Sequence, residues 1–173
     1  MELVFKNFYG AKKKLTIANG SVIFWKGGLL VGPISKQTRS LLTHSAIVLY
    51  KDGGPWVYEA TTPCVRCMRL GEYESHLKTL GDSRFFKRRD FSWFTVQPRL
   101  AYTIVALGAM HLYAKSQLGR PYMLRGWWQQ QEVRGIFCSQ YVGNIIEKSG
   151  LIQSANYQES PGSLYQKLLP YYN

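Results

Sequence analysis

Short apolar runs and two-residue alternation mark the first half of the chain, and helical spacing of apolar residues marks the second half. The runs Ser21–Trp25 and Thr43–Tyr50 predict buried strands. A further run over 56–61 follows the turn signal Asp52-Gly53-Gly54, which predicts a hairpin. Apolar and basic side chains alternate over Val65–Leu70, so we expect a strand with one face in water.

Helical spacing appears in several segments, and a long helix over Arg99–Leu118 is the most extended of them. Gly119 and Pro121 provide its stop signal. Shorter predicted helices and one further strand complete the pattern: helices over Ser35–Leu42, Tyr73–Leu80 and Ser163–Leu169, and a strand over Arg84–Arg89. Strands followed by helices predict an α+β fold.

We expect one domain, because 173 residues is close to the commonest domain size. It comprises a basic leader over residues 1–18, a strand-rich part over 19–97 and a helical part over 98–173. The apolar run Leu100–Ala114 is too short for a membrane span, and we expect a core helix there. Residues 1–6 lack the pattern of a secretory signal, so we expect a cytoplasmic protein, or one peripheral to a membrane.

A cysteine stands at the start of the best-marked helix. Apolar residues at Tyr141, Val142, Ile145 and Ile146 have helical spacing, Ser139 is a candidate cap, and Gly150 ends the helix. Cys138 therefore lies at a helix N-terminus, where free N–H groups and the helix dipole favour thiolate. The alternative is a small buried hydrophobic residue without chemistry.

The best candidate for a base beside such a thiol is His44, which lies in an otherwise apolar strand. The partner strand carries Glu59, and burial of an unpaired carboxylate would be costly. If Gly53-Gly54 is the loop, Glu59 faces Val48 and shares a sheet face with His44. On flat strands this register leaves the pair four residues, or roughly 13 Å, apart. A satisfied core histidine is the alternative interpretation of His44.

The net charge indicates which class of partner the protein binds, and the cysteine content indicates its compartment. Lys and Arg number 22 against 10 Asp and Glu, a formal net charge of +12. The cations are dispersed and no nucleic-acid motif accompanies them, so an anionic membrane surface is a better candidate partner than a nucleic acid. Three cysteines without framework spacing suit a reducing compartment.

A pair of cysteines and a pair of tryptophans are two further candidates for a site. Cys64 and Cys67 form a Cys-x-x-Cys, but no second pair accompanies them and a strand would send the two thiols to opposite faces. We therefore predict no metal site and no cofactor. Trp127 and Trp128 lie just before Cys138 and are either hydrophobic cover or the roof of an apolar substrate channel.

The order of five short motifs resembles the circularly permuted NlpC-type papain-like proteins. That group includes YiiX-like bacterial proteins, a poxvirus branch and lecithin retinol acyltransferase relatives. The resemblance extends from about Gly20 to Leu164, and each motif is short, so the order is its specific part. The motifs are Gly20–Phe24, Thr43–Ile47, Val57–Ala60, Leu118–Tyr122 and Phe137–Val142.

The resemblance implies a papain-like fold in which the histidine precedes the cysteine. His44 would be the general base, Glu59 the residue that orients it, and Cys138 the nucleophile. By the same resemblance Tyr122 approaches the oxyanion site together with the backbone N–H of Cys138.

The function we expect is a cysteine-dependent hydrolase or acyltransferase that forms a thioester on Cys138. Its substrate is an amide or an acyl ester, with acyl lipids favoured by the aromatic content, the positive charge and the lipid-active relatives. The alternatives are a peptidase or amidase acting on a peptide or cell-wall-type amide, and a catalytically silent papain-like binding module. Substrate identity and oligomeric state are beyond the sequence.

Overall fold

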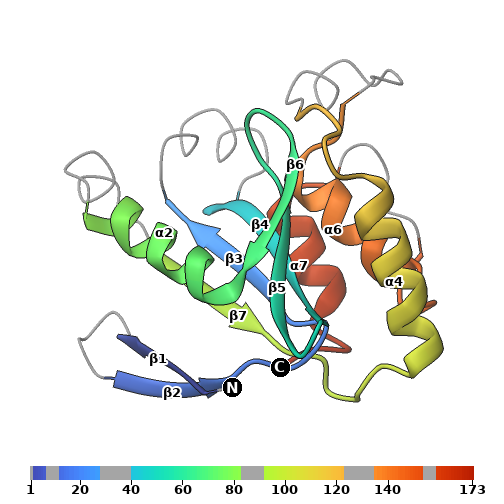
Figure 1. Ribbon diagram of the computed structural model, residues 1–173, viewed down its shortest axis with the longest axis horizontal. Coiled ribbons are helices and arrows are strands. Elements are labelled where there is room, and N and C mark those ends of the chain that lie inside the picture. The colour runs from blue at the N-terminus through green and yellow to red at the C-terminus, as the bar shows by residue number, and fades with distance from the viewer. Residues whose placement is uncertain (1, 7–11, 28–39, 83–91, 123–134, 154–158) are drawn as a thin grey trace.

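The computed structural model describes residues 2–6, 12–27, 40–82, 92–122, 135–153 and 159–173. Its main element is a five-stranded antiparallel sheet in the order β6-β5-β4-β3-β7 (Figure 1). The strands are β3 (Val22–Lys26), β4 (Leu42–Lys51), β5 (Gly54–Ala60), β6 (Val65–Arg69) and β7 (Ser92–Val96). The predicted α+β class is confirmed.

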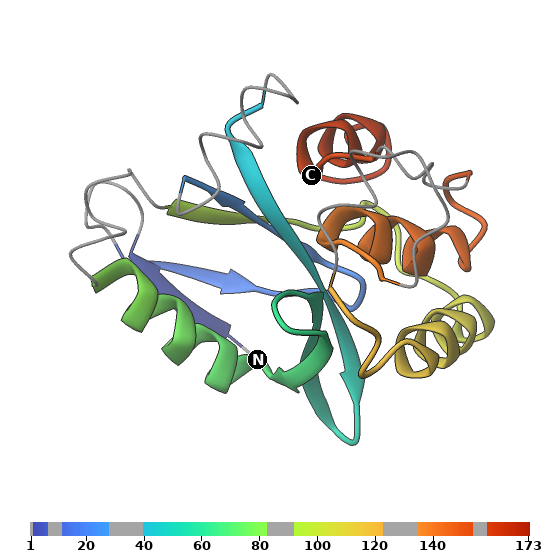
Figure 2. The same cartoon turned by 90° about the horizontal axis from the view of Figure 1, so that it is seen from above.

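Helices cover both faces of the sheet, which therefore has a core on each side. Helix α2 (Leu70–Asp82) packs on one face, where Val48 and Val57 meet Tyr73. On the other face lie α4 (Ile104–Ser116), α6 (Cys138–Glu147) and α7 (Pro161–Leu168). Figures 1 and 2 show α6 between the sheet and α4, which forms the outer edge of the molecule. Burial of β4 from both sides explains its apolar composition.

The β4–β5 hairpin differs from the predicted register. Asp52 and Gly53 form the turn, both with positive φ (50° and 75°), whereas the prediction placed the loop at Gly53-Gly54. Two central residues with positive φ are typical of the tight turn that matches strand twist. Val48 therefore pairs with Val57 instead of Glu59. The β4–β5 pairs end at Ile47 and Tyr58, and one further step in this register would set Glu59 opposite Ala46, two residues from His44 instead of four.

Several predicted elements are confirmed and several are corrected. The strands at 21–25, 43–50 and 65–70 and the helix at the C-terminus are present, the helix with a capping box between Ser160 and Ser163. Helix α2 begins at Leu70, before the predicted start. The leader contains a two-stranded hairpin, β1 (Glu2–Lys6) and β2 (Lys12–Thr16), which the sequence did not predict.

The predicted long helix from Arg99 was wrong at its start. Thr103 caps α4 by accepting a hydrogen bond from the Ala106 N–H, so the helix begins at Ile104. It was also wrong as a core helix, because within α4 only Met110 and Ala114 are buried. Strand β7 was not predicted. The predicted strand at 84–89 lies outside the described residues. Most of the predicted helix at 35–42 also lies outside them, and its last residue belongs to β4.

None of the helices in the described ranges combines the length and the apolar character that crossing a bilayer demands.

Gly20, just before β3, is packed closely against the ring of Tyr102. Its φ is +89°, and a Cβ placed there would lie 2.5 Å from Cε2 of Tyr102, whose hydroxyl is held by Tyr172 at 2.6 Å. We predict that Gly20→Ala lowers the free energy of unfolding by about 2–4 kcal/mol, the sum of backbone strain and overpacking. Urea denaturation measures this change.

Gly53→Ala is the matched control, because its φ of +75° carries the same strain with no atom within 4 Å of the new Cβ. It should cost about 1–2 kcal/mol. Equal losses for the two variants would contradict the close packing of Tyr102 on Gly20.

Candidate active site

A buried ion pair between His44 and Glu59 forms the base of the site. The two side chains project from neighbouring strands β4 and β5 on the same sheet face, as predicted. The Nε2 atom of His44 lies 2.8 Å from Oε2 of Glu59. The corrected hairpin register makes this contact possible, because a two-residue offset corresponds to about 7 Å along the strands, within reach of the two side chains. The Glu59 residue is 0% exposed and His44 6%.

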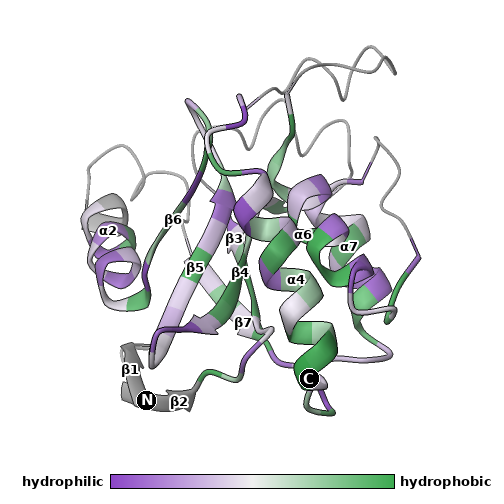
Figure 3. Cartoon of the chain, turned by 45° about the vertical axis from the view of Figure 1, so that its right-hand side comes forward, coloured by the Kyte–Doolittle hydropathy of each residue, from purple (hydrophilic) through white to green (hydrophobic). Residues whose placement is uncertain are grey.

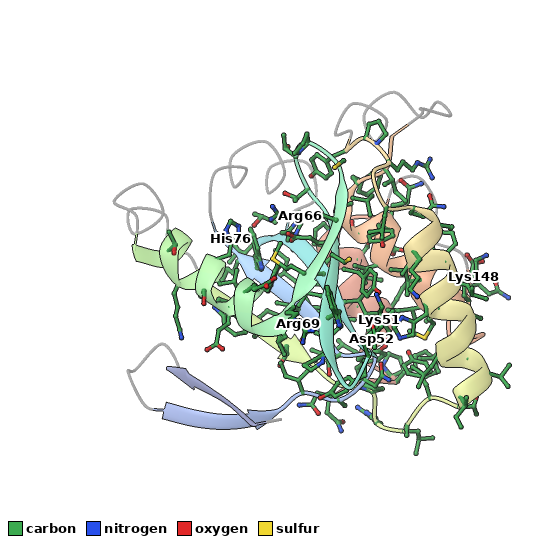
Figure 4. The ribbon with its side chains drawn as sticks, in the orientation of Figure 1. Lys51, Asp52, Arg66, Arg69, His76 and Lys148 are labelled. Carbon is green, nitrogen blue, oxygen red and sulfur yellow. The ribbon has the colours of Figure 1, made fainter. Side chains whose placement is uncertain are left out.

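Two further groups hold the Glu59 carboxylate. Arg66 on β6 stands directly opposite Glu59 and donates to Oε1 from Nε at 2.8 Å and from Nη2 at 2.6 Å. Tyr73 on α2 donates its hydroxyl proton to Oε2 at 3.2 Å. Burial alone would raise the pKa of Glu59, but the hydrogen bonds and charges of His44 and Arg66 bring it down to about 2. The carboxylate is therefore ionised at neutral pH. Figure 4 shows where Arg66 lies on the sheet.

Cys138 is the first residue of α6, and its sulfur completes the network. The side chain is buried, and its hydrogen-bond partners are the His44 ring and the backbone N–H groups of Ser45 and Ser139. Since Nε2 of His44 faces Glu59, Nδ1 is the ring nitrogen left for the sulfur. The histidine thus bridges carboxylate and thiol.

The start of α6 differs from the prediction in one detail. Phe137 is the N-cap and makes no side-chain capping bond, whereas Ser139 was the predicted cap. The Ser139 hydroxyl instead donates to the carbonyl of Glu159, which fixes the first turn of α6 to the segment before α7. In this first turn the Ser139 N–H is directed toward the sulfur of Cys138.

The pair of Cys138 and His44 is polarised toward thiolate and imidazolium. Burial opposes ionisation of the thiol, but the positive charge and hydrogen bond of His44, with the two backbone N–H groups, bring the pKa of Cys138 below its usual value. Burial likewise opposes protonation of His44, and the charges of Cys138 and Glu59 raise the His44 pKa from 6.5 to about 10. A lowered pKa increases the fraction of thiolate, which is the nucleophilic form of cysteine.

Tyr122 joins the site from the segment after α4. A bridge to Ile136 and a hydrogen bond from its N–H to the Pro63 carbonyl at 2.9 Å fix its backbone. Its hydroxyl is a hydrogen-bond partner of the Cys138 sulfur. Burial first, and then the charge of Cys138, raise the pKa of this phenol, so the hydroxyl stays protonated and donates.

Sequence reasoning missed three residues around His44 and Glu59. They are Arg66, Tyr73 and Trp25, whose ring lies 4.3 Å from the His44 ring, centroid to centroid. The sequence could have indicated Arg66. It is a basic residue of the alternating strand β6, which pairs with the strand that carries the buried Glu59. Tyr73 and Trp25 stand among ordinary apolar positions and gave none.

The Cys-x-x-Cys pair takes no part in the contacts described for this network. Cys64 and Cys67 are half-buried free thiols. Within the described ranges, no three His, Cys, Asp or Glu side chains gather into a set able to hold a metal ion. Trp127 and Trp128 lie outside the described residues.

Comparison with known proteins gives a structural match. It is the crystal structure of the metalloprotein YiiX from Escherichia coli O157:H7, also designated DUF1105, with a TM-score of 0.58 and 17% sequence identity. The match covers 77% of this chain and 66% of the YiiX chain, so this chain spans slightly less than two thirds of that structure. No protein-family model matches the chain, and no curated protein matches it in sequence.

The likeness to YiiX establishes the fold. The chain has the permuted NlpC-type papain-like architecture that its motif order predicted: an antiparallel sheet that carries the histidine, followed along the chain by the helix that begins with the cysteine.

Arg66 allows a test of the Glu59 carboxylate. Since the folded-state pKa of Glu59 is about 2 against 4.5 ordinarily, this group stabilises the fold above pH 4.5, and the stabilisation is lost as the pH falls toward 2. We predict that Arg66→Gln costs about 1–2 kcal/mol at neutral pH. The difference from the wild type should shrink below pH 4.5, as urea denaturation at stepped pH will measure.

Arg69→Gln provides the matched control on the same strand, where the guanidinium stacks on Trp56 at 5.2 Å. Its effect should not change between pH 4.5 and 2. A difference for Arg66→Gln that is equally constant would contradict the link between Arg66 and the ionised Glu59.

Proposed function

We propose that this chain with a permuted papain-like fold is a cysteine-dependent acyl hydrolase or acyltransferase. The observation that supports the proposal is the continuous chain of contacts from Glu59 through His44 to Cys138 at the start of α6. In this proposal Cys138 is the nucleophile, His44 the general base and acid, and Glu59 the residue that orients His44.

The reaction begins with attack of the Cys138 thiolate on the carbonyl carbon of an amide or acyl ester. A bond forms between sulfur and carbon, and the carbonyl electron pair moves to oxygen as an oxyanion. When the oxyanion collapses, the bond to the leaving amine or alkoxide breaks, and the imidazolium of His44 protonates that group. The product left on the protein is a thioester on Cys138.

The second half of the reaction removes the acyl group. Water, or an acceptor amine or hydroxyl, gives its proton to the neutral His44 ring as it attacks the thioester carbonyl. When this second oxyanion collapses, the bond between carbon and sulfur breaks and the acid or the transferred acyl product is released. Sulfur leaves as thiolate, and the proton stays on His44, which restores the resting pair. Water gives hydrolysis, and an acceptor gives transfer.

The oxyanion is stabilised in this proposal by the start of α6 and by Tyr122. Backbone N–H groups at a helix N-terminus are fixed donors that need no reorganisation when negative charge develops. The protonated Tyr122 hydroxyl, which contacts the sulfur in the resting protein, is close enough to the reacting centre to add a second donor.

Glu59 has a defined part in this mechanism. By accepting from Nε2, the carboxylate fixes the ring so that Nδ1 faces the sulfur, and it stabilises the imidazolium. Arg66 and Tyr73 hold the carboxylate in turn, so the histidine is oriented by a group that cannot rotate freely.

An acyl lipid is the substrate class we favour. The net charge of +12 suits a substrate presented at an anionic surface, and the permuted proteins that the sequence resembles include acyltransferases of lipids. A peptide or cell-wall-type amide is the rival substrate within the same chemistry.

Alkylation of Cys138 tests the activated thiol. In a Cys64→Ser, Cys67→Ser background Cys138 is the remaining thiol, since the chain has three cysteines. We predict that iodoacetamide labels it well below pH 9, its usual thiol pKa, and that His44→Ala slows labelling about tenfold or more at neutral pH because the thiol loses its cationic partner. Mass spectrometry of timed samples gives the rates.

His76→Ala is the matched control for this experiment, because His76 lies on α2 and is no partner of Cys138 in the described contacts. It should leave the pH–rate profile unchanged. Identical profiles for His44→Ala and the parent protein would rule out activation of Cys138 by His44.

Acyl transfer to Cys138 tests the substrate class. We predict that incubation with a diacyl phospholipid gives an acyl adduct on Cys138 that hydroxylamine removes, because hydroxylamine cleaves thioesters. Mass spectrometry of the intact protein measures the adduct, and Cys138→Ala should give none. Cleavage confined to a peptide amide would favour the peptidase, and a reactive Cys138 with turnover of neither substrate would favour a binding module.

A further inference from the structure

Helix α4 exposes large apolar side chains on its outer side. Ile104 is 89% exposed, Val105 83% and Leu112 74%. The preceding Leu100 is also 83% exposed. Figure 3 shows α4 facing the viewer with its first turns coloured hydrophobic. Surface helices ordinarily present charged or polar residues to water, so exposed aliphatic groups at consecutive turns need an explanation.

These exposed residues form one strip along the helix. At 100° per residue, Ile104, Val105, Gly108 and Leu112 fall within about 100° of one another. The buried Met110 and Ala114 fall on the opposite side, against the sheet and α6. We call the four residues the apolar strip. Lys115 follows it in the last turn.

Lysines border the apolar strip on both flanks. On one flank Nζ of Lys148 lies 5.3 Å from the ring centroid of Tyr113, a residue of α4. On the other flank, Nε2 of His111 lies 2.9 Å from the Tyr50 carbonyl oxygen. Burial lowers the pKa of this ring, and the charges of the nearby Lys115 and Lys51 lower it further. Figure 4 shows Lys51 and Lys148 on opposite sides of α4.

Two carboxylates lie near these lysines: Asp52, which pairs with Lys51 at 3.3 Å, and the half-buried Glu147, whose charge acts on Tyr113. Asp52 neutralises Lys51, so the exposed Lys115 and Lys148 supply the local positive charge. Helix α4 itself carries no Asp or Glu. An aliphatic strip with cations beside it and at its end is complementary to the edge of an anionic bilayer, where acyl chains lie below negative headgroups.

We propose that the outer side of α4 is the surface by which this protein docks on an anionic lipid bilayer. The apolar strip enters the boundary between headgroups and acyl chains, and Lys115 and Lys148 lie against the headgroups. The 13 residues of α4 span about 20 Å, short of the roughly 30 Å of a hydrocarbon core, so the helix lies in the interface.

Charge favours a bilayer over a second copy of the chain as the occupant. Two molecules of net charge +12 that met through α4 would bring their lysine borders together, and like charges at an interface oppose association. The docking needs no reaction at Cys138, so binding and the proposed chemistry succeed or fail separately.

Vesicle co-sedimentation tests the proposal with the full chain. We expect binding to phosphatidylcholine vesicles that contain phosphatidylserine, with little binding to phosphatidylcholine alone and a loss of binding at high salt. The triple substitution Ile104→Ser, Val105→Ser, Leu112→Ser should weaken binding about tenfold or more because it removes the inserted aliphatic groups. Leu41→Ser, at a leucine 58% exposed outside α4, should have no effect.

Two double variants that lose the same charge distinguish the effect of the lysines beside α4 from the effect of the net charge. Lys115→Gln with Lys148→Gln should weaken binding by at least about tenfold, whereas Lys26→Gln with Lys78→Gln, away from α4, should change it little. Hydrogen exchange of the wild-type protein, which needs no variant to fold, should show added protection of residues 104–112 on vesicles.

Three results would overturn the proposal. The first is no binding of the wild-type protein to anionic vesicles. The second is equal binding of the strip variant, with no added protection of residues 104–112. The third is a dimer in lipid-free solution, seen by sedimentation and lost in the strip variant, which would assign the strip to a second copy.

Discussion

The Glu59 carboxylate is withdrawn from water completely, and a buried negative charge is tolerated only when cations and hydrogen-bond donors surround it. Three elements supply these partners: β4 through His44, β6 through Arg66 and α2 through Tyr73. Because each partner is fixed by its own strand or helix, the carboxylate has one position. That position fixes the His44 ring, and the ring faces the sulfur of Cys138.

The same arrangement explains why the site lies where sheet and helices meet. His44 is held on the α2 side of the sheet, whereas Cys138 comes from α6 on the other side. The N–H groups of Ser45 and Ser139, one from the strand and one from the helix, both reach the sulfur. Negative charge on the sulfur is therefore stabilised by the two halves of the fold together, which is consistent with a thiol that is buried and yet acidic.

Local patterns in the sequence were enough to predict the α+β class, most strands and the helix that begins at Cys138. They were also enough to suggest that Cys138 acts together with His44 and Glu59. The hairpin register was wrong because Asp52, which is not glycine, adopts positive φ, and the two-residue turn therefore lies one position earlier than predicted. Tyr73 and Trp25 were missed because only the packing of distant elements brings them to Glu59 and His44, and the signal at Arg66 depends on the β5–β6 pairing. Helical spacing could not show that α4 turns its aliphatic residues outward. The start of α4 depended on a single cap, Thr103, inside an apolar run.

Ionisation of the His44 ring at rest is the physical state on which the proposed chemistry depends. Nitrogen NMR of the labelled ring across a pH titration reports the protonation of each ring nitrogen directly. We expect both nitrogens to carry protons from pH 6.5 upward, with loss of a proton only near pH 10, as the charges of Cys138 and Glu59 require. A ring that titrates near 6.5, as an isolated imidazole does, would contradict the thiolate–imidazolium pair.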